Sequence, residues 1–135
     1  MQKFILFFAF ASLMFVGCKK DNSTTEQLQN NNYPGTYTGV YTVYSGVDAG
    51  TDYNATMVVT SNVSGGVDLK LTAGTIVENM VGTITSDSKL QLAVQNVGGL
   101  KMTGAGELTD SDQVLTLTLT SVTSGLKGGF FKGKK

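Results

Sequence analysis

Residues 113–122 read QVLTLTLTSV and carry the clearest folding signal in this 135-residue chain. Leu115, Leu117 and Leu119 alternate with threonines, so an extended chain places the three leucines on one face and the threonines on the other. A period of two is typical of a half-buried β-strand, and β-branched threonine suits its exposed face. The segment therefore predicts a strand whose leucines point into a core.

The same alternation recurs from residue 36 onward, and turn-forming sequences such as Gly98-Gly99 interrupt it. No segment shows a helical period, and the connections are short, so neighbouring strands should pair antiparallel in a meander. We expect an all-β domain in which an eight-stranded antiparallel meander closes as a small barrel, because closure removes exposed strand edges. A two-sheet β-sandwich is the alternative. The expected strands are 36–44, 53–61, 67–72, 75–85, 89–97, 100–109, 113–122 and 129–133.

Alternation also assigns the inward faces of most strands. Leu90, Leu92 and Val94 are expected to point inward from one strand. The strand at 75–85 is ambiguous, because Glu78 shares a face with apolar residues. A carboxyl group in that position anchors the polar group of a ligand, lies near solvent at a strand end, or is turned outward by a bulge.

Two further features bear on whether the barrel holds a cavity. The methionines that follow Cys18 all fall on apolar faces, where they either line an adaptable binding surface or fill gaps in an ordinary core. Several glycines also point inward, and they either leave room for a ligand or ease the coiling of a small barrel. These glycines are Gly39, Gly82, Gly104 and Gly106. The candidate ligand-binding residues are Tyr37, Tyr53, Met57, Glu78, Met80 and Met102.

The composition excludes several kinds of chemistry. The chain has no histidine, no tryptophan and no arginine, and Cys18 is its only cysteine. A Ser-His-Asp triad and the usual zinc sites therefore have no residues to form them. The formal net charge is zero, so no basic field attracts nucleic acid. We expect a protein that is not an enzyme, that needs no cofactor or metal, and that binds no nucleic acid.

The N-terminus has the pattern of a secretory signal. Lys3 precedes an apolar run over residues 4–16, and this run is too short for a bilayer core that requires about 20 residues. The sequence Phe15-Val16-Gly17-Cys18 resembles the lipobox of Gram-negative bacterial lipoproteins. This resemblance implies cleavage before Cys18 and acylation of that cysteine with fatty acids such as palmitate. It also implies attachment to the lipid bilayer of the outer membrane, with the cell surface as one location.

The chain is thus expected to have three parts. A signal peptide covers residues 1–17, and the lipidated cysteine with a flexible tether covers residues 18–32. The tether is polar and has too few apolar residues to fold by itself. The all-β domain covers residues 33–135.

The start of that domain, Gly35-Thr36-Tyr37-Thr38-Gly39, resembles the Gly-x-Trp opening of lipocalin-like barrels, with tyrosine in place of tryptophan. The resemblance implies that Tyr37 plugs the base of the barrel and that a basic residue packs on its ring. Because arginine is absent, Lys132 and Lys134 are the candidates for this packing. Families with this opening often bind small apolar ligands, although a fold alone does not carry a function.

Two functions are open on the sequence alone. The favoured one is a membrane-anchored lipoprotein whose barrel binds a small apolar or amphipathic ligand. The alternative is a structural or interaction lipoprotein with a filled core and a protein partner, such as a subunit of a surface complex or a hydrolase inhibitor. A void above about 300 Å³ that is lined by the candidate ligand-binding residues favours ligand binding. A densely packed interior favours the alternative.

Replacing Cys18 with alanine removes the residue that the lipobox resemblance marks for acylation. We expect the Cys18→Ala variant to accumulate as an unprocessed precursor, because no acyl chains are attached to hold a mature form in the membrane. The mass of the chain and its distribution between membrane and soluble fractions measure both effects. Recovery of the variant in the mature, membrane-held form contradicts the assignment.

Overall fold

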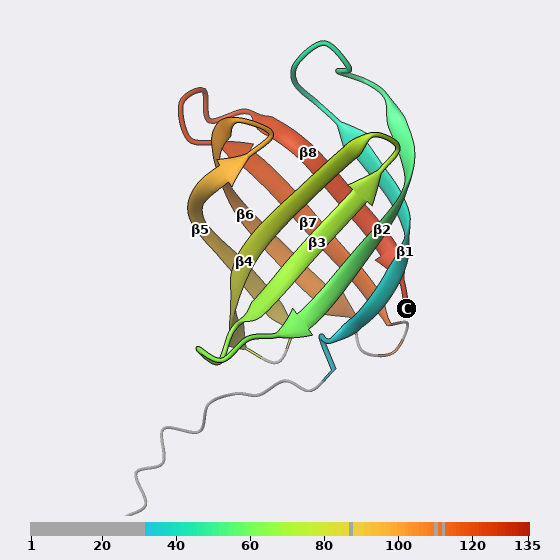
Figure 1. Cartoon of the computed structure of the whole chain (residues 1–135), viewed down its shortest axis with the longest axis vertical. Helices are drawn as coiled ribbons and strands as arrows, with labels where there is room; N and C mark the ends of the chain where they lie inside the picture. Colours follow the sequence, from blue (N-terminus) through green and yellow to red (C-terminus); the bar gives the residue numbers. More distant parts are fainter. Residues whose placement is uncertain (1–31, 87, 110, 112) are drawn as a thin grey trace, which may run out of the picture.

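The computed structural model of the chain describes residues 32–86, 88–109, 111 and 113–135. The expected signal peptide, Cys18 and the expected tether up to residue 31 lie outside the described residues. The strands are β1 (Gly35–Val43), β2 (Asp52–Ser61), β3 (Val67–Ala73), β4 (Ile76–Ser86), β5 (Lys89–Val97), β6 (Leu100–Thr109), β7 (Val114–Ser121) and β8 (Lys127–Lys134). Each strand pairs antiparallel with the next, and β8 pairs with β1, so the meander closes into a barrel (Figure 1). The expected eight-stranded barrel is confirmed, and the sheet does not divide into a sandwich.

The strands follow the alternation of the sequence. Leu115, Leu117 and Leu119 of β7 are buried, and the threonines between them are partly exposed. In β3 every second residue is buried. Because the period-two pattern marks each strand so clearly, the expected bounds differ from the observed ones by at most two residues, at the start of β8.

The barrel interior is filled by the side chains of the chain itself. Tyr37, Met57 and Phe131 are fully buried, and leucines from β3, β5, β6 and β7 pack around them. No charged or polar residue is buried in the described part of the chain. This arrangement is expected for eight strands, because a barrel of that size is just wide enough for side chains to fill it.

The inward glycines give room to neighbouring protein atoms. A Cβ atom on Gly82 would lie 2.6 Å from Cδ1 of Leu90, and the ring of Tyr41 occupies the space above Gly129. Side-chain or backbone atoms also occupy the space above the other glycines that were expected to point inward. These are Gly39, Gly104 and Gly106. The glycines therefore allow close packing in a small barrel.

One irregularity in β5 overturns an expected side-chain direction. Leu92 pairs with Gly104, whereas Gln95 pairs with Met102, so β5 carries one more residue than β6 over this interval. Such a bulge reverses the alternation beyond it. Val94 consequently points outward with 59% of its surface exposed, and Val97 is buried instead. The prediction that Val94 faces inward is wrong for this reason.

The end of the barrel at which the described chain begins is closed by aromatic residues. The hydroxyl of Tyr37 donates a hydrogen bond of 2.7 Å to the backbone oxygen of Tyr33. Tyr33 is also fully buried. The Lys135 ammonium group lies 5.8 Å from the centre of the Tyr37 ring and donates to the backbone oxygen of Asn32 at 2.9 Å. Lys135 therefore packs on Tyr37, and the expectation of Lys132 or Lys134 is wrong, because both alternate onto the exposed face of β8.

Adjacent phenylalanines in β8 provide a test of the packing. Phe131 is fully buried, whereas Phe130 is only partly buried on the other face of the strand. We expect Phe131→Ala to lower the free energy of unfolding by about 3–5 kcal/mol, because it removes a core ring and leaves a cavity. Phe130→Ala should cost about 1 kcal/mol or less. Urea denaturation measures both values, and equal losses would contradict the assigned faces.

Candidate functional site

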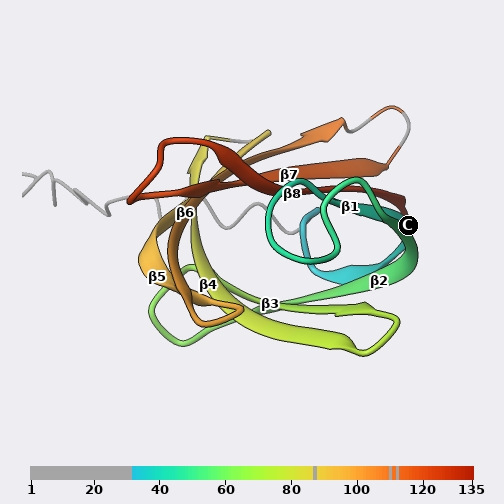
Figure 2. The same cartoon turned by 90° about the horizontal axis from the view of Figure 1, so that it is seen from above.

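The four turns at the far end of the barrel surround its open end. These turns, 44–51, 74–75, 98–99 and 122–126, join β1 to β2, β3 to β4, β5 to β6 and β7 to β8. They lie opposite the end at which Asn32 enters, and Figure 2 looks onto them from above. A pocket of about 170 Å³ lies at this end and is lined by residues from strands on both sides of the barrel. We call it the mouth pocket.

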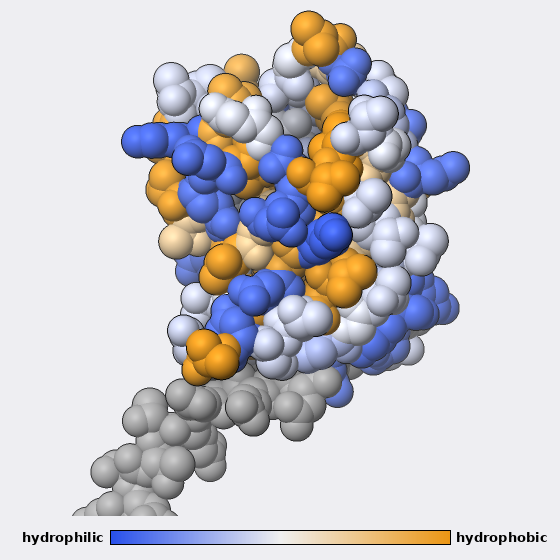
Figure 3. All heavy atoms as spheres, in the orientation of Figure 1, coloured by the Kyte–Doolittle hydropathy of each residue, from blue (hydrophilic) through white to orange (hydrophobic). Residues whose placement is uncertain are grey.

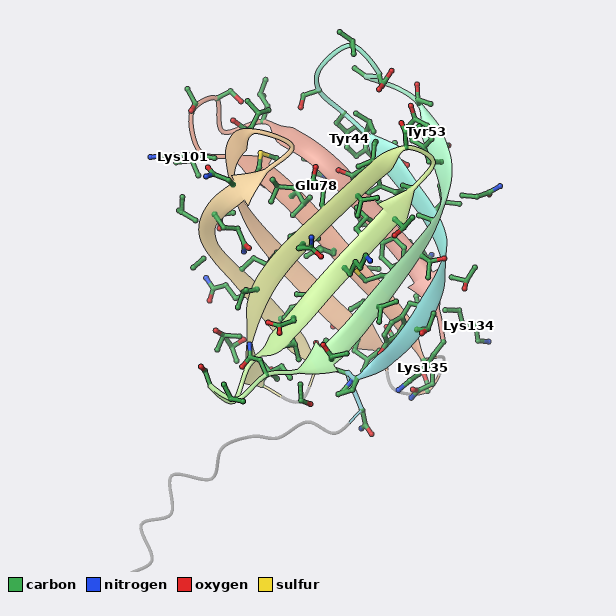
Figure 4. The ribbon with its side chains drawn as sticks, viewed as in Figure 1. Tyr44, Tyr53, Glu78, Lys101, Lys134 and Lys135 are labelled. Atoms are coloured by element: carbon green, nitrogen blue, oxygen red, sulfur yellow. The ribbon has the colours of Figure 1, made fainter. Side chains whose placement is uncertain are left out.

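The mouth pocket is apolar except for a few groups. Glu78 supplies its single charge, and Tyr41 and Ser45 supply hydroxyl groups. A Cβ atom on Gly98 would lie 3.5 Å from Oε1 of Glu78, so the half-buried carboxyl group reaches toward the turn between β5 and β6. In Figure 4, Glu78 lies in the upper half of the barrel, and Lys101 points away from it into solvent. The apolar side chains around these groups are Val43, Ile76, Val97, Leu100, Met102 and Leu119.

Two tyrosines at this end have altered acidity. Burial raises the pKa of Tyr41, and the negative charge of Glu78 raises it further. The pKa of Tyr53 is also raised, first by desolvation and then by the charge of Asp48 and a hydrogen bond to it. Both tyrosines therefore keep their protons at neutral pH, and their hydroxyl groups are hydrogen-bond donors.

The structure brings together two of the six candidate ligand-binding residues, because only Glu78 and Met102 line the mouth pocket. Tyr37 and Met57 are fully buried in the filled interior, and Met80 is almost fully buried. Tyr53 is half-buried near the start of β2, outside the pocket lining. The six residues share inward faces but lie at different depths along the barrel, so they do not form one site.

Tyr41 is not among the six candidate ligand-binding residues, although its position in the sequence indicates that it lies near the mouth pocket. Tyr41 lies on the same face of β1 as Tyr37, four residues nearer the open end. A strand rises about 3.3 Å per residue, so counting residues from Tyr37 places Tyr41 beyond the plug and close to the mouth. Val97 had no such signal, because the bulge in β5 determines its direction.

The wall of the barrel is incompletely paired beside the mouth pocket. Within the described residues, the pairing of β4 with β5 consists of Thr83 with Gln91, Ile84 with Leu90 and Ser86 with Lys89. Residues 76–82 of β4 have no backbone partner in residues 92–97 of β5. We call these two facing segments the seam. Figures 1 and 2 show the two strands diverging toward the open end, where β4 stays with β3 and β5 stays with β6.

A side chain bridges the seam at its lower end. The amide nitrogen of Gln95 donates to the backbone oxygen of Val81 at 2.8 Å. The backbone N–H of Val81 donates to the side-chain oxygen of Gln95 at 2.9 Å. The carboxamide of Gln95 thus makes the two hydrogen bonds that the backbone N–H and C=O of one facing residue make in a regular antiparallel ladder.

Exposed apolar side chains gather around the open end. Val47 is fully exposed in the turn after β1, and Leu126 is 68% exposed in the turn before β8. Tyr44 is also exposed, and the Lys127 ammonium group lies 6.0 Å from the centre of its ring. Figure 3 shows apolar residues at the top of the molecule and in a broken band over the face formed by β3 and β4. The other exposed apolar residues in or beside these turns are Val77, Leu100 and Val122.

The described residues contain neither a metal-binding cluster nor a membrane-spanning helix. No group of three or more histidine, cysteine, aspartate or glutamate residues in them is arranged to hold a metal ion. They also contain no helix that is long and apolar enough to cross a membrane. No family model, curated protein or solved structure matches the chain.

The raised pKa of Tyr41 gives a direct test of the charge in the mouth pocket. We expect Tyr41 to ionise above its ordinary pKa of about 10 and Glu78→Gln to lower that pKa part of the way, because burial is the larger cause. Since the folded state holds this proton more tightly than the unfolded chain, the stabilisation is complete below about pH 10 and is lost as the pH rises through the raised pKa. NMR titration of ¹³C-labelled tyrosine measures the shift, with Tyr41→Phe identifying the signal. An unchanged pKa in Glu78→Gln would contradict the proximity of the two groups.

Proposed function

We propose that the protein is a lipoprotein held at the outer membrane through acylated Cys18, and that its barrel is an interaction module which binds a protein partner at the open end. The observation that carries this proposal is the contrast between a filled interior and an apolar open end. The core side chains occupy the barrel, whereas the turns around the mouth pocket expose apolar side chains to solvent.

The size of the mouth pocket supports a protein partner over a small-molecule ligand. Sites for small molecules usually enclose about 300–1,000 Å³, and the mouth pocket encloses about 170 Å³. A pocket of this size suits one side chain from a partner. Binding energy in protein interfaces is often concentrated in a few side chains that fill such pockets, and surrounding residues exclude water from them.

The exposed side chains around the mouth pocket are apolar, as expected for residues that exclude water from a pocket in a protein interface. Val47 and Leu126 come from two different turns, Leu100 begins β6 directly after a third, and all three are substantially exposed. Exposed apolar groups that cluster at one place, with polar residues around them, are typical of interaction sites. The opposite end of the barrel has a single comparable residue among the described ones, Val63 in the turn between β2 and β3.

The position of Asn32 supports the proposed orientation on the membrane. The described chain begins with Asn32 at the closed end, and the open end lies on the far side of the barrel (Figure 1). A tether that joins Cys18 to this point attaches the closed end to the bilayer. The mouth pocket then faces away from the lipid, toward a partner in the periplasm or at the cell surface.

The proposal assigns the barrel no catalytic role. Glu78 and Tyr41 supply the acidic groups of the mouth pocket, and neither is paired there with a histidine or a cysteine. A protein that works by contact alone, including an inhibitor of a hydrolase, does not need such a pair.

A small amphipathic ligand is a second candidate, and the mouth pocket favours it in one respect. Glu78 and Met102 combine a charged group with a flexible apolar wall. A ligand there would have to be small and to carry a positively charged group. Co-purification of such a molecule, detected by native mass spectrometry, would favour this candidate.

Site-specific crosslinking tests the proposed interaction. A photoreactive amino acid replaces Val47 or Leu126 at the open end, or Val63 at the closed end, in the full chain expressed in its native host. Val47 and Val63 are equally exposed, at 102% and 107%, and so form a matched pair. We expect the same discrete protein partner to crosslink at Val47 and Leu126 and not at Val63. Equal crosslinking at all three positions, or none at the open end, would contradict the proposal.

A further inference from the structure

The seam presents an edge of β4 whose backbone groups are directed toward a missing neighbour. In an antiparallel strand, alternate residues direct their N–H and C=O groups to the same side. Val81 directs both groups across the seam, because both bond to Gln95. Asn79 and Val77 have the same parity, so their backbone groups are directed to the same side, where β5 provides no paired strand.

The Gln95 bridge marks the place at which the barrel ends its own ladder. The bulge in β5 lies just before Gln95 and turns the strand away from β4. A side-chain amide then occupies the next position along the β4 edge, and the amide also donates to the backbone oxygen of Ala93 at 3.3 Å. Beyond this bridge the edge is free, and a free edge is a template for another extended chain.

We propose that an extended segment of the protein partner adds to the β4 edge at the seam as a further strand and places a basic side chain beside Glu78. This inference rests on the proposed function and names the form of the partner. Only an extended backbone matches the spacing of the groups on a strand edge, and several recognition domains bind peptides in this way. The basic side chain follows from Glu78, the single charge of the mouth pocket.

The inner and outer faces of β4 at the seam determine which residues the partner's extended segment should carry. Glu78 lies on the inner face of β4, so a basic side chain at the neighbouring position points into the mouth pocket. Val77 and Val81 lie on the outer face and are each more than half exposed. Cross-strand neighbours on one face of a sheet stabilise each other when both are apolar. The expected segment is therefore extended, with outward apolar residues on both sides of an inward lysine or arginine.

A hollow on the outer face continues the site away from the seam. It encloses about 520 Å³ across β2, β3 and β4, and Asn79 and Val81 form its boundary on the β4 side. Val58 contributes a further apolar group to it, and Asp68 an acidic one. Outward side chains of a segment on the β4 edge would lie beside this hollow, which gives long apolar side chains a place to pack.

A peptide with blocked ends tests the inference, and its sequence is Val-Thr-Val-Lys-Val-Thr-Val. It is titrated into the full ¹⁵N-labelled chain, purified in detergent, while amide spectra are recorded. We expect chemical-shift changes and slowed hydrogen exchange at Val77 and Asn79, because their backbone groups gain partners. The control peptide carries N-methyl groups on the two valines that flank the lysine, which removes the N–H donors and keeps the side chains. It should not bind.

Two variants separate recognition from simple packing. Glu78→Gln should weaken binding of the lysine peptide about tenfold, because it replaces a charge-assisted hydrogen bond, whereas a peptide with glutamate at the centre should not bind the natural chain. Gln95→Ala should strengthen binding about three- to tenfold, because it releases the N–H and C=O groups of Val81 to the peptide. If Gln95 only stabilised the barrel, the variant would be less stable and would bind no more tightly.

Three results would overturn the inference. These are unchanged signals of Val77 and Asn79 in both the natural chain and a folded Gln95→Ala variant, equal binding of the N-methylated peptide, and equal binding of the lysine and glutamate peptides. Self-association of the chain through the same residues without peptide would also overturn it, in favour of a second copy. If the peptide fails while crosslinks at Leu126 persist, the strand inference is wrong and the proposed function stands. If the peptide binds at the seam and no crosslink forms in cells, the proposed function fails.

Discussion

An eight-stranded barrel encloses only enough space for the side chains of its own strands, and the rest of this structure depends on that constraint. The chain meets it with leucines on alternate positions, a few large aromatic rings and glycines wherever a ring or a neighbouring strand comes close. Tyr41 fits because Gly129 has no side chain, and Leu90 fits because Gly82 has none. Filling the interior this completely leaves the rim, the outer face and the seam as the places where other molecules can be bound.

Most of the fold was predictable because its determinants are local. A period of two can be read over a few residues, and turns with glycine or aspartate mark where each strand ends. The direction of Val94 was not predictable in this way, because it depends on a bulge that arises from the pairing of β5 with β6. The packing of Lys135 on Tyr37 is also non-local, because it joins the two ends of the described chain. Alternation identifies faces, and it says nothing about which distant residue lies opposite.

In the candidate site, too, local features could be predicted from the sequence and non-local features could not. Glu78 was identified as an acid on an apolar face, and it lies in the mouth pocket, because facing direction can be read from one strand. Tyr37 and Met57 have the same inward direction but lie in the filled interior, since depth along the barrel depends on the register of all the strands. The seam had no sequence signal at all. It results from the limited pairing of β4 with β5, and the role of Gln95 is visible only with Val81 in place.

The closed end also determines how the barrel bears mechanical load. A force transmitted through Asn32 reaches β1 along the axis of that strand, and β1 is paired on one side with β2 and on the other with β8. Hydrogen bonds between antiparallel strands lie across the strand axis, so such a force shears many of them together and does not open them one at a time. The bond from Lys135 to Asn32 joins the end of β8 to the same point. A pull on the open end that is resisted at Asn32 would therefore load a strand that is paired on both sides, and many hydrogen bonds would have to break together before the barrel opened.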